Sequence, residues 1–399
     1  MEEPILVAGG GLGGLFTALA LGRRGIAVRV LEQAPAFEAI GYGIQLGPNV
    51  FPHLERLGLR EAVLGAAHLP PAVLMLDALS GEEVARIPTG ASFQRRFRHP
   101  YVVIHRVDLY EILLAACRDT PGITLEPSTA VAGFEAGDDG VRVRTAEGRE
   151  IRGAALIGAD GLRSAVRAQL RAEGEPDAVG YVAHRTLVPM EQVPAHVRRD
   201  EVILWGGPGF HIVHYPLRAN SVFNIVAVFR TETHAQRRDP AAYKAELQHT
   251  YRDAHPAMKT LLSLMSLERR WPISDRAPIR HWSHGRVTLL GDAAHPTLQS
   301  LAQGACMAIE DGSFLAELVG QAAGDHAAAF RRYAAERYVR TSRVQLESRA
   351  LWDVYHCDGI ARDVRRQTFG ERSEEDYFRC LAWLYDGADP PAALRSAAA

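Results

Sequence analysis

The stretch ILVAGGGLGGLFTALALGRRG, residues 5–25, decides the fold of this chain. Residues 5–8 are apolar and predict a short buried strand, and the glycines after them predict a tight turn. The turn leads into an apolar helix that ends at Gly25, because a glycine commonly stops a helix. A second predicted strand, AVRVLEQ at 27–33, follows directly, so the chain opens with a strand–helix–strand unit.

Three glycines in that turn, Gly9, Gly11 and Gly14, satisfy the pattern G-x-G-x-x-G. The pattern suits dinucleotides because its glycines allow a tight turn, leave room for a pyrophosphate at the helix N-terminus, and let helix and strand pack closely. Glu32 ends the second strand, where a carboxylate can accept hydrogen bonds from both ribose hydroxyls of an adenosine. The start of the chain therefore predicts a dinucleotide site, and this motif alone leaves FAD and NAD open.

Length and composition limit the classes of protein. The chain has 399 residues, which favours two domains, and its 47% hydrophobic and 23% charged residues are typical of a soluble globular protein. A net charge of −2 gives no general attraction for nucleic acid or anionic membranes. The uncharged run at 5–22 contains six glycines and lacks a basic flank, so we expect no membrane span. Four scattered cysteines predict neither a disulfide framework nor a metal site, and they favour a cytoplasmic protein.

The middle of the chain differs from its two ends. Between about 185 and 270, the segments EVILWGG, GFHIVHYPLRA and SVFNIVAVFR predict strands at hairpin spacing. The sequence therefore predicts an α/β fold: a Rossmann-like dinucleotide-binding domain (a GR2-type βαβ unit with a parallel sheet), an inserted antiparallel-sheet domain, and a C-terminal helical region. The predicted boundaries are 1–75, 101–180 and 270–385 for the first domain with its C-terminal helices, 76–100 and 181–269 for the inserted domain, and 386–399 for a flexible tail.

Two further motifs stand at the ends of predicted buried strands. LIGADGLRSAVR, residues 156–167, places Asp160 and Gly161 at a strand end, and taken alone it is an ordinary strand-to-helix turn. RVTLLGDAAH, residues 286–295, ends a strand near an Asp that can meet a ribityl or ribose hydroxyl. AQGACMAIEDG, residues 302–312, then starts a helix whose N-terminal amides can face an anionic ring edge.

Taken together and in this order, the three motifs resemble those of the flavoprotein aromatic hydroxylases, single-component monooxygenases similar to para-hydroxybenzoate hydroxylase. The resemblance covers nearly the whole chain. It implies FAD as the bound dinucleotide, NADH as a co-substrate bound transiently, and the inserted sheet as the substrate domain. The FAD-binding residues that we predict on this basis are Gly9, Gly11, Gly14, Glu32, Gln45, Arg106, Asp160, Gly161, Gly291, Asp292, Pro296 and Gly304.

One predicted strand of the inserted domain, GFHIVHYPL at 209–217, carries two histidines. Because alternate strand residues share a face, His211 lies with Tyr215, and His214 lies on the other side. Hydroxylation of a phenol by a flavin 4a-hydroperoxide requires an electron-rich ring, and a neutral histidine can accept the phenol proton near pH 7. We predict His211 as the base, with His214 as the alternative, and Tyr215 as a group that binds the substrate carboxylate or relays a proton.

Gln299 stands where many relatives carry a proline above the flavin. Its amide can donate to one oxygen and accept from a hydroxyl, so it can set the orientation of a substrate ring. With His211 and Tyr215 it resembles the 3-hydroxybenzoate 6-hydroxylases within the family, which implies hydroxylation of 3-hydroxybenzoate para to its hydroxyl group to give gentisate, with NADH and O₂. The salicylate 1-hydroxylases and the 6-hydroxynicotinate 3-monooxygenases resemble the proline version and are the alternatives.

Several points stay open in the sequence. It singles out no arginine for the substrate carboxylate, and it does not separate NADH from NADPH. A homodimer, common among such relatives, is the expected assembly. An NAD(P)-dependent dehydrogenase or a non-catalytic dinucleotide-binding redox sensor would also use the first glycine motif, but neither requires the motifs at Asp160 and Asp292.

Overall fold

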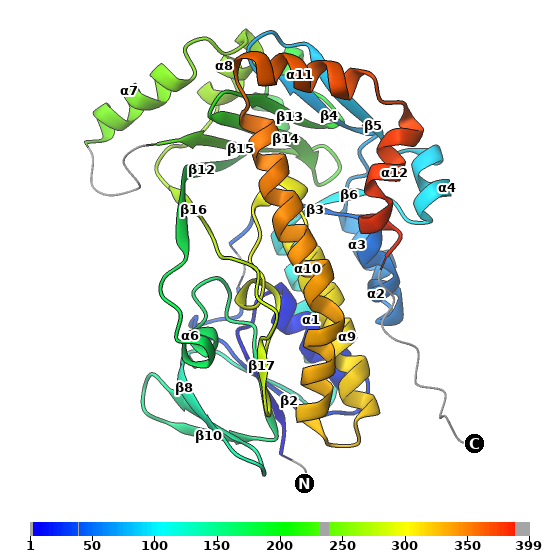
Figure 1. Cartoon of the computed structure of the whole chain (residues 1–399), viewed down its shortest axis with the longest axis vertical. Helices are drawn as coiled ribbons and strands as arrows, with labels where there is room; N and C mark the ends of the chain where they lie inside the picture. Colours follow the sequence, from blue (N-terminus) through cyan, green and yellow to red (C-terminus); the bar gives the residue numbers. More distant parts are fainter. Residues whose placement is uncertain (1–2, 39, 232–238, 388–399) are drawn as a thin grey trace.

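The computed structural model describes residues 3–38, 40–231 and 239–387. Most of the predicted tail, residues 388–399, lies outside the described residues. Two layered parts lie along the long axis of the molecule, and helix α10 (His326–His356) runs between them (Figure 1). The 31 residues of α10 contact elements of both parts, so this helix fixes one part against the other.

Six strands form the sheet that the opening motif predicts. β1 (Ile5–Ala8) lies between β2 (Val28–Leu31) and β11 (Ala155–Gly158), and both pairs are parallel. β11 in turn pairs in parallel with β18 (Val287–Leu289). Since the carboxyl ends of parallel strands meet at one edge of a sheet, the motifs that follow β1, β11 and β18 come together there. The strands at the two ends of the sheet are β7 (Ile123–Glu126) and β17 (Ser283–His284).

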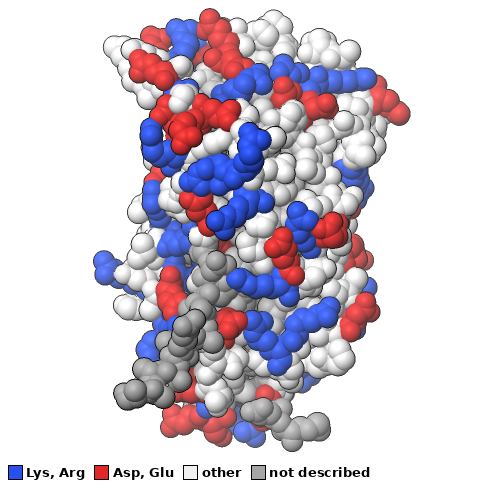
Figure 2. Space-filling view, turned by 90° about the vertical axis from the view of Figure 1, so that its right-hand side faces the viewer, with Lys and Arg blue, Asp and Glu red and all other residues white. Residues whose placement is uncertain are grey.

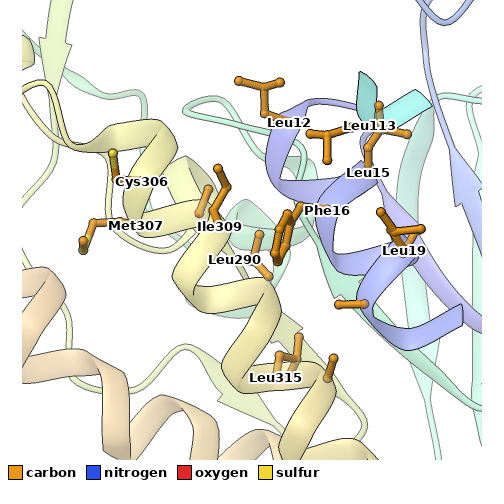
Figure 3. Packing of buried hydrophobic residues seen from close by; sticks show 14 of the residues in the cluster. Leu12, Leu15, Phe16, Leu19, Leu113, Leu290, Cys306, Met307, Ile309 and Leu315 are labelled. Carbon is orange, nitrogen blue, oxygen red and sulfur yellow. The ribbon is translucent and has the colours of Figure 1, made fainter. Parts of the chain in front are cut away.

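Helix α1 (Leu12–Gly22) packs against this sheet, and α9 (Gly304–Gln321) packs side by side with α1. Phe16 of α1 faces Ile309 of α9 and the neighbouring Leu290, and all three side chains are buried (Figure 3). Burial of side chains of this size contributes roughly 1.5–3 kcal/mol each. The packing holds the N-terminal ends of both helices at the edge where the three motifs meet.

A seven-stranded sheet forms the second part. Its central strands, β15 (Val222–Arg230), β14 (Phe210–Leu217) and β13 (Val202–Gly207), run antiparallel, as the hairpin spacing predicts. β12 (Asp177–Pro189), a strand that is absent from our predictions, pairs with β15. The remaining strands are β4 (Ala72–Asp77), β5 (Glu83–Pro88) and β16 (Trp271–Asp275). The predicted α/β class is confirmed. The inserted sheet is antiparallel except where β4 pairs with β13 in parallel, and it extends a few residues beyond the boundaries expected for the inserted domain.

The C-terminal helices close the molecule over the second sheet. α11 (Gly359–Gly370) begins after Asp358, whose side chain accepts a hydrogen bond from the Gly359 amide. α12 (Glu374–Tyr385) begins with a capping box, in which Ser373 and Asp376 bond each other's backbone amides. These caps satisfy amides that the first helical turn leaves free.

Further strands and helices connect these parts. They are the strands β3 (Gly43–Leu46), β6 (Val102–His105), β8 (Val131–Ala136), β9 (Val141–Thr145) and β10 (Glu150–Gly153), and the helices α2 (Phe51–Arg56), α3 (Arg60–Ala66), α4 (Ala91–Phe97), α5 (Arg106–Arg118), α6 (Ala165–Arg171), α7 (Pro240–Thr250) and α8 (Pro256–Ser263). Basic and acidic residues lie interspersed on the face shown in Figure 2. In the described ranges, no helix combines the length and the apolar character needed to cross a bilayer.

Candidate active site

The glycine turn after β1 leaves space at the start of α1. Gly9 has φ +102°, and a Cβ on it would collide with the Ala159 carbonyl. A Cβ on Gly14 would collide with the Gly9 carbonyl, so the turn and the helix touch only because both residues are glycine. Gly11 is the N-cap of α1, and a Cβ there would meet nothing within 4 Å. The open space beside these helix amides fits a pyrophosphate.

Glu32 lies at the carboxyl end of β2, next to this turn. Its two carboxylate oxygens accept hydrogen bonds from the amides of Gly10, at 2.7 Å, and Ala34, at 2.8 Å. The backbone therefore holds the carboxylate at the site where the motif predicts a ribose. The glycines and Glu32 together fit the adenosine half of FAD.

The motif after β11 is joined to the loop after β18 by one buried arginine. Ser164 donates to Asp160 at 2.5 Å, and burial raises the pKa of the Asp160 carboxyl. Arg167, in the helix that follows, donates to the carbonyls of Ala293 at 3.0 Å and Ala294 at 2.9 Å. The side chain of Arg167 thus ties the second motif to the third.

The loop after β18 rests on a buried cluster of charges. His295 Nε2 lies 2.5 Å from Asp311 Oδ2, and Arg337 Nε donates to Asp311 Oδ1 at 2.8 Å. Arg337 and Arg340 also donate to Glu310, at 2.7 Å each. Burial alone would raise the pKa of Glu310, but these two arginines outweigh it and lower the pKa to about 2. The carboxyls of Glu310 and Asp311 therefore stay ionised at neutral pH, and the cluster anchors the loop to α9 and α10.

The second half of the same loop is bonded to α10. Gln345 donates to the Pro296 carbonyl at 2.8 Å, and Ser300 donates to the Ser348 carbonyl at 2.5 Å. Thr297 donates to the Ser348 hydroxyl at 2.9 Å. The path of the loop is therefore set largely by residues outside it.

A cavity of about 830 Å³ lies between this loop, the second sheet and the C-terminal helices. Asp292, Gln299 and Gly304 line it from the loop and from the start of α9. The Asp292 side chain is open to the cavity, and the surrounding protein raises the pKa of its carboxyl. A carboxyl at this place can accept from a ribityl hydroxyl, so the loop fits the flavin half of FAD.

His211 and Tyr215 line the opposite wall, on β14. Burial lowers the pKa of His211 well below its usual value and raises that of Tyr215. At neutral pH the wall therefore offers a neutral imidazole and a phenol that can donate. Gly43 backs the tyrosine so closely that a Cβ would strike its ring, and Gln45, which accepts from Tyr101, also lines the cavity.

His214 faces away from the cavity. Trp205 donates to its Nε2 at 3.0 Å, and burial lowers the pKa of His214 to about 3. Its ring packs against Phe223 in the core on the far side of the sheet. The geometry therefore favours His211 over His214 as a base for a molecule in the cavity.

Arg185 is a cavity residue that the sequence does not single out. It lies on β12 opposite Val226 of β15, which itself lies opposite Val213 of β14, so Arg185 projects from the same face as His211. Its Nη2 donates to Gln299 Oε1 at 2.9 Å, across the cavity from sheet to loop. The alternation of residues within 181–189 indicates a strand. The position of Arg185 on the cavity face follows only from the pairing of β12, β15 and β14.

Most of the predicted residues therefore fall into two groups. Gln45, His211, Tyr215, Asp292, Gln299 and Gly304 share the cavity. The glycines of the first motif, Glu32, Asp160 and Gly161 lie at the carboxyl edge of the parallel sheet. Arg106 begins α5, is exposed, and donates to the Ile40 carbonyl at 3.2 Å. Pro296 is buried in the loop after β18.

Known proteins match this chain over most of its length. A family model for the FAD binding domain matches residues 2–347. The 3-hydroxybenzoate 6-hydroxylase of Polaromonas naphthalenivorans (strain CJ2) is 42% identical over 384 residues, which is 96% of this chain and 96% of that protein. The 3-hydroxybenzoate 6-hydroxylase of Klebsiella oxytoca is 38% identical over 95% of this chain and 96% of its own length. Among solved structures, HpxO of Klebsiella pneumoniae, complexed with FAD and uric acid, is 26% identical with a TM-score of 0.85, covering 96% of this chain and 97% of that one.

Proposed function

This chain belongs to the FAD binding domain family, and from that membership we propose that it is an FAD-dependent monooxygenase that hydroxylates 3-hydroxybenzoate para to its hydroxyl group to give gentisate. NADH is the proposed reductant and O₂ the oxidant. The relatives named 3-hydroxybenzoate 6-hydroxylase favour this reaction over the salicylate and 6-hydroxynicotinate alternatives. Family membership argues against a dehydrogenase or a non-catalytic sensor.

The observation that carries the proposal is the pairing of a neutral His211 with Asp292 and Gln299 across one cavity. Bound FAD supplies the activated oxygen. His211 accepts the phenol proton, which makes the ring electron-rich at the carbon para to the oxygen. Tyr215, whose pKa burial raises, keeps its proton and donates a hydrogen bond to the substrate. His211 and Tyr215 are both buried, which limits their contact with water.

Arg185 is our candidate for binding the substrate carboxylate. Its guanidinium lies on the same sheet face as His211 and Tyr215, and it lines the cavity. A bond to a carboxylate from a charged donor contributes roughly 1.5–3 kcal/mol, more than a neutral donor does. Gln299 holds one guanidinium nitrogen through its Oε1, and its Nε2 is buried with no partner among the described residues. That amide nitrogen can donate to the substrate, so Gln299 can orient the ring.

A substrate panel tests the proposal. The purified yellow holoprotein is mixed with NADH and, separately, with 3-hydroxybenzoate, salicylate and 6-hydroxynicotinate, and products are separated by chromatography. We expect substrate-stimulated NADH oxidation with 3-hydroxybenzoate and gentisate as its product. Faster turnover of either other acid, or a product that has lost its carboxylate, contradicts the proposal. A parallel series with NADPH tests the reductant.

We also propose a cytoplasmic homodimer. The four cysteines are free thiols in the structure, which is the usual state in a reducing compartment. The dimer rests on the family resemblance alone. Light scattering of the holoprotein at micromolar concentration tests it, and a monomer mass contradicts it.

A further inference from the structure

A second histidine stands behind His211. His211 Nδ1 lies 2.8 Å from Nε2 of His356, the last residue of α10. The His356 ring is stacked on Tyr181, with centroids 4.7 Å apart, and meets Trp352 nearly edge-on at 4.8 Å. These aromatic rings hold the plane of His356 so that its Nε2 faces His211. Because the His211 side chain lines the cavity, its Nε2 is the nitrogen left for a bound molecule.

Both rings are neutral at pH 7. Burial lowers the pKa of His356 to about 4, and burial together with His356 lowers that of His211 well below its usual value. Arg365 of α11 acts in the same direction on His356, whereas the Trp352 backbone opposes it. Tyr181 and Tyr355 are the other titratable side chains packed on the pair. Two neutral imidazoles at this distance share one proton, so one nitrogen donates and the other accepts.

The role of His211 as a base decides which ring donates. A base in the cavity needs an unprotonated His211 Nε2, which places the proton of the neutral ring on Nδ1. That Nδ1–H needs an acceptor, and His356 Nε2 lies 2.8 Å from it. His356 Nε2 then accepts through its lone pair, and the proton of the neutral His356 ring lies on its buried Nδ1.

We infer that His356 is a positioning residue: it accepts the Nδ1–H of His211 and thereby keeps an unprotonated Nε2 of His211 turned toward the cavity. The inference rests on the proposed function. When substrate reacts, the phenol O–H bond breaks and an Nε2–H bond forms on His211. The resulting imidazolium donates its Nδ1–H to His356, which disperses the new charge. A base whose second nitrogen is held by a third group has the arrangement that activated bases commonly require.

The tautomer is tested without substrate, by ¹⁵N NMR of the FAD-loaded protein labelled at histidine. Signals of His211 are assigned from their loss in His211→Gln. We expect a proton on Nδ1 and an unprotonated Nε2. His356→Phe keeps a ring against Tyr181 and removes the acceptor, so the proton should redistribute toward Nε2, whereas His356→Gln should restore the original tautomer through its carbonyl oxygen. A proton on His211 Nε2 in the parent protein, or an unchanged tautomer in His356→Phe, overturns the inference.

The consequence for turnover is tested with 3-hydroxybenzoate. We expect His356→Phe to lower kcat by on the order of 10²-fold at pH 7 with little change in KM, and to move the acid limb of the pH profile. His356→Gln should recover most of the loss, and Cys357→Ser, the neighbouring control, should change neither. If the parent protein shows the expected tautomer but does not turn over 3-hydroxybenzoate, the proposed function fails and the positioning role stands. If turnover occurs and His356→Phe retains the parent kcat and pH profile, the positioning role fails.

Discussion

On one side of the cavity the loop at 291–301 rests on full charges, whereas on the sheet side the polar groups are kept neutral. Glu310 and Asp311 are fully buried with Arg337, and the arginines lower the pKa of Glu310 to about 2 despite its burial. In the sheet, burial lowers the pKa of His211 well below its usual value and raises that of Tyr215, and behind the cavity wall it lowers the pKa of His184 to about 4. One region is built so that its groups stay ionised, and the other so that they do not.

The difference separates two tasks. Paired buried charges fix geometry, since each holds its partner and neither can leave without a large desolvation penalty. They exchange no protons near neutral pH. Neutral imidazoles and phenols are weaker anchors, but they can accept or donate a proton during a reaction. The loop is therefore suited to hold a cofactor, and the sheet wall to act on a substrate.

The largest expected effect is on stability, from Arg337→Leu. This change leaves two buried carboxylates without their shared cation, and breaking a buried pair costs about 3–5 kcal/mol. Urea unfolding of the holoprotein measures it. The control is Arg332→Leu on the same helix, which removes an exposed pair with Glu336 and should cost under about 1 kcal/mol. Equal losses in the two variants would show that the charged cluster is not an anchor.

Acid should weaken the two regions in different pH windows. His184 has a folded pKa of about 4 against 6.5 when exposed, so the unfolded chain binds its proton first and stability falls as the pH drops from 6.5 toward 4. Glu310 has a folded pKa of about 2 against 4.5, so its contribution is complete above 4.5 and is lost as the pH falls toward 2. Each shift corresponds to on the order of 3 kcal/mol. Unfolding free energies measured from pH 7.5 to pH 3 that stay level between 6.5 and 4.5 would contradict the first window.

The two histidines of β14 offer a matched pair. His211→Gln should lower kcat by on the order of 10²-fold while FAD stays bound, because the base is lost. His214→Leu should leave kcat unchanged and cost about 1–3 kcal/mol of stability, because the Trp205 N–H loses its acceptor. Steady-state kinetics and urea unfolding on both variants measure this. The reverse outcome would make His214 the base.

Arg185→Leu should act on substrate binding. Loss of a charge-assisted bond to the carboxylate should raise KM for 3-hydroxybenzoate about ten- to a hundredfold. 3-Hydroxybenzyl alcohol, which has no carboxylate, should bind equally well to parent and variant. Arg343→Leu is the control, since that arginine also lines the cavity but stacks on Trp383, 4.0 Å from its ring centroid. Similar effects of both changes would remove Arg185 as the carboxylate partner.

Gln299→Ala should have the smallest effect on rate and a visible effect on outcome. Without the amide, Arg185 loses its restraint and the substrate ring loses a donor, so more NADH should be oxidised without hydroxylation, or the product should change. The amounts of peroxide and gentisate formed per NADH oxidised measure the fraction of turnovers that do not hydroxylate the substrate. Unchanged coupling and product would remove Gln299 from ring orientation.

Local patterns in the sequence predicted what local geometry decides. The glycine spacing predicted the turn before α1, and strand alternation predicted that His211 and Tyr215 share a face. Arg185 and His356 were not predicted, because their positions depend on pairing at long range. Arg185 reaches the site through the register of three strands, and His356 lies 145 residues from His211 in the chain. The roles of Glu32, Arg106 and the other FAD-binding residues stay predictions.

The loop at 291–301 bears on how this protein could be engineered. Its carbonyls are held from outside by Arg167 and Gln345, and its Ser300 hydroxyl by the backbone at Ser348. A library randomised at position 299 alone can therefore be screened for altered products while the loop backbone keeps its position. Grafting the whole loop from a relative is a different undertaking, because the graft must carry its outside anchors with it or lose its shape.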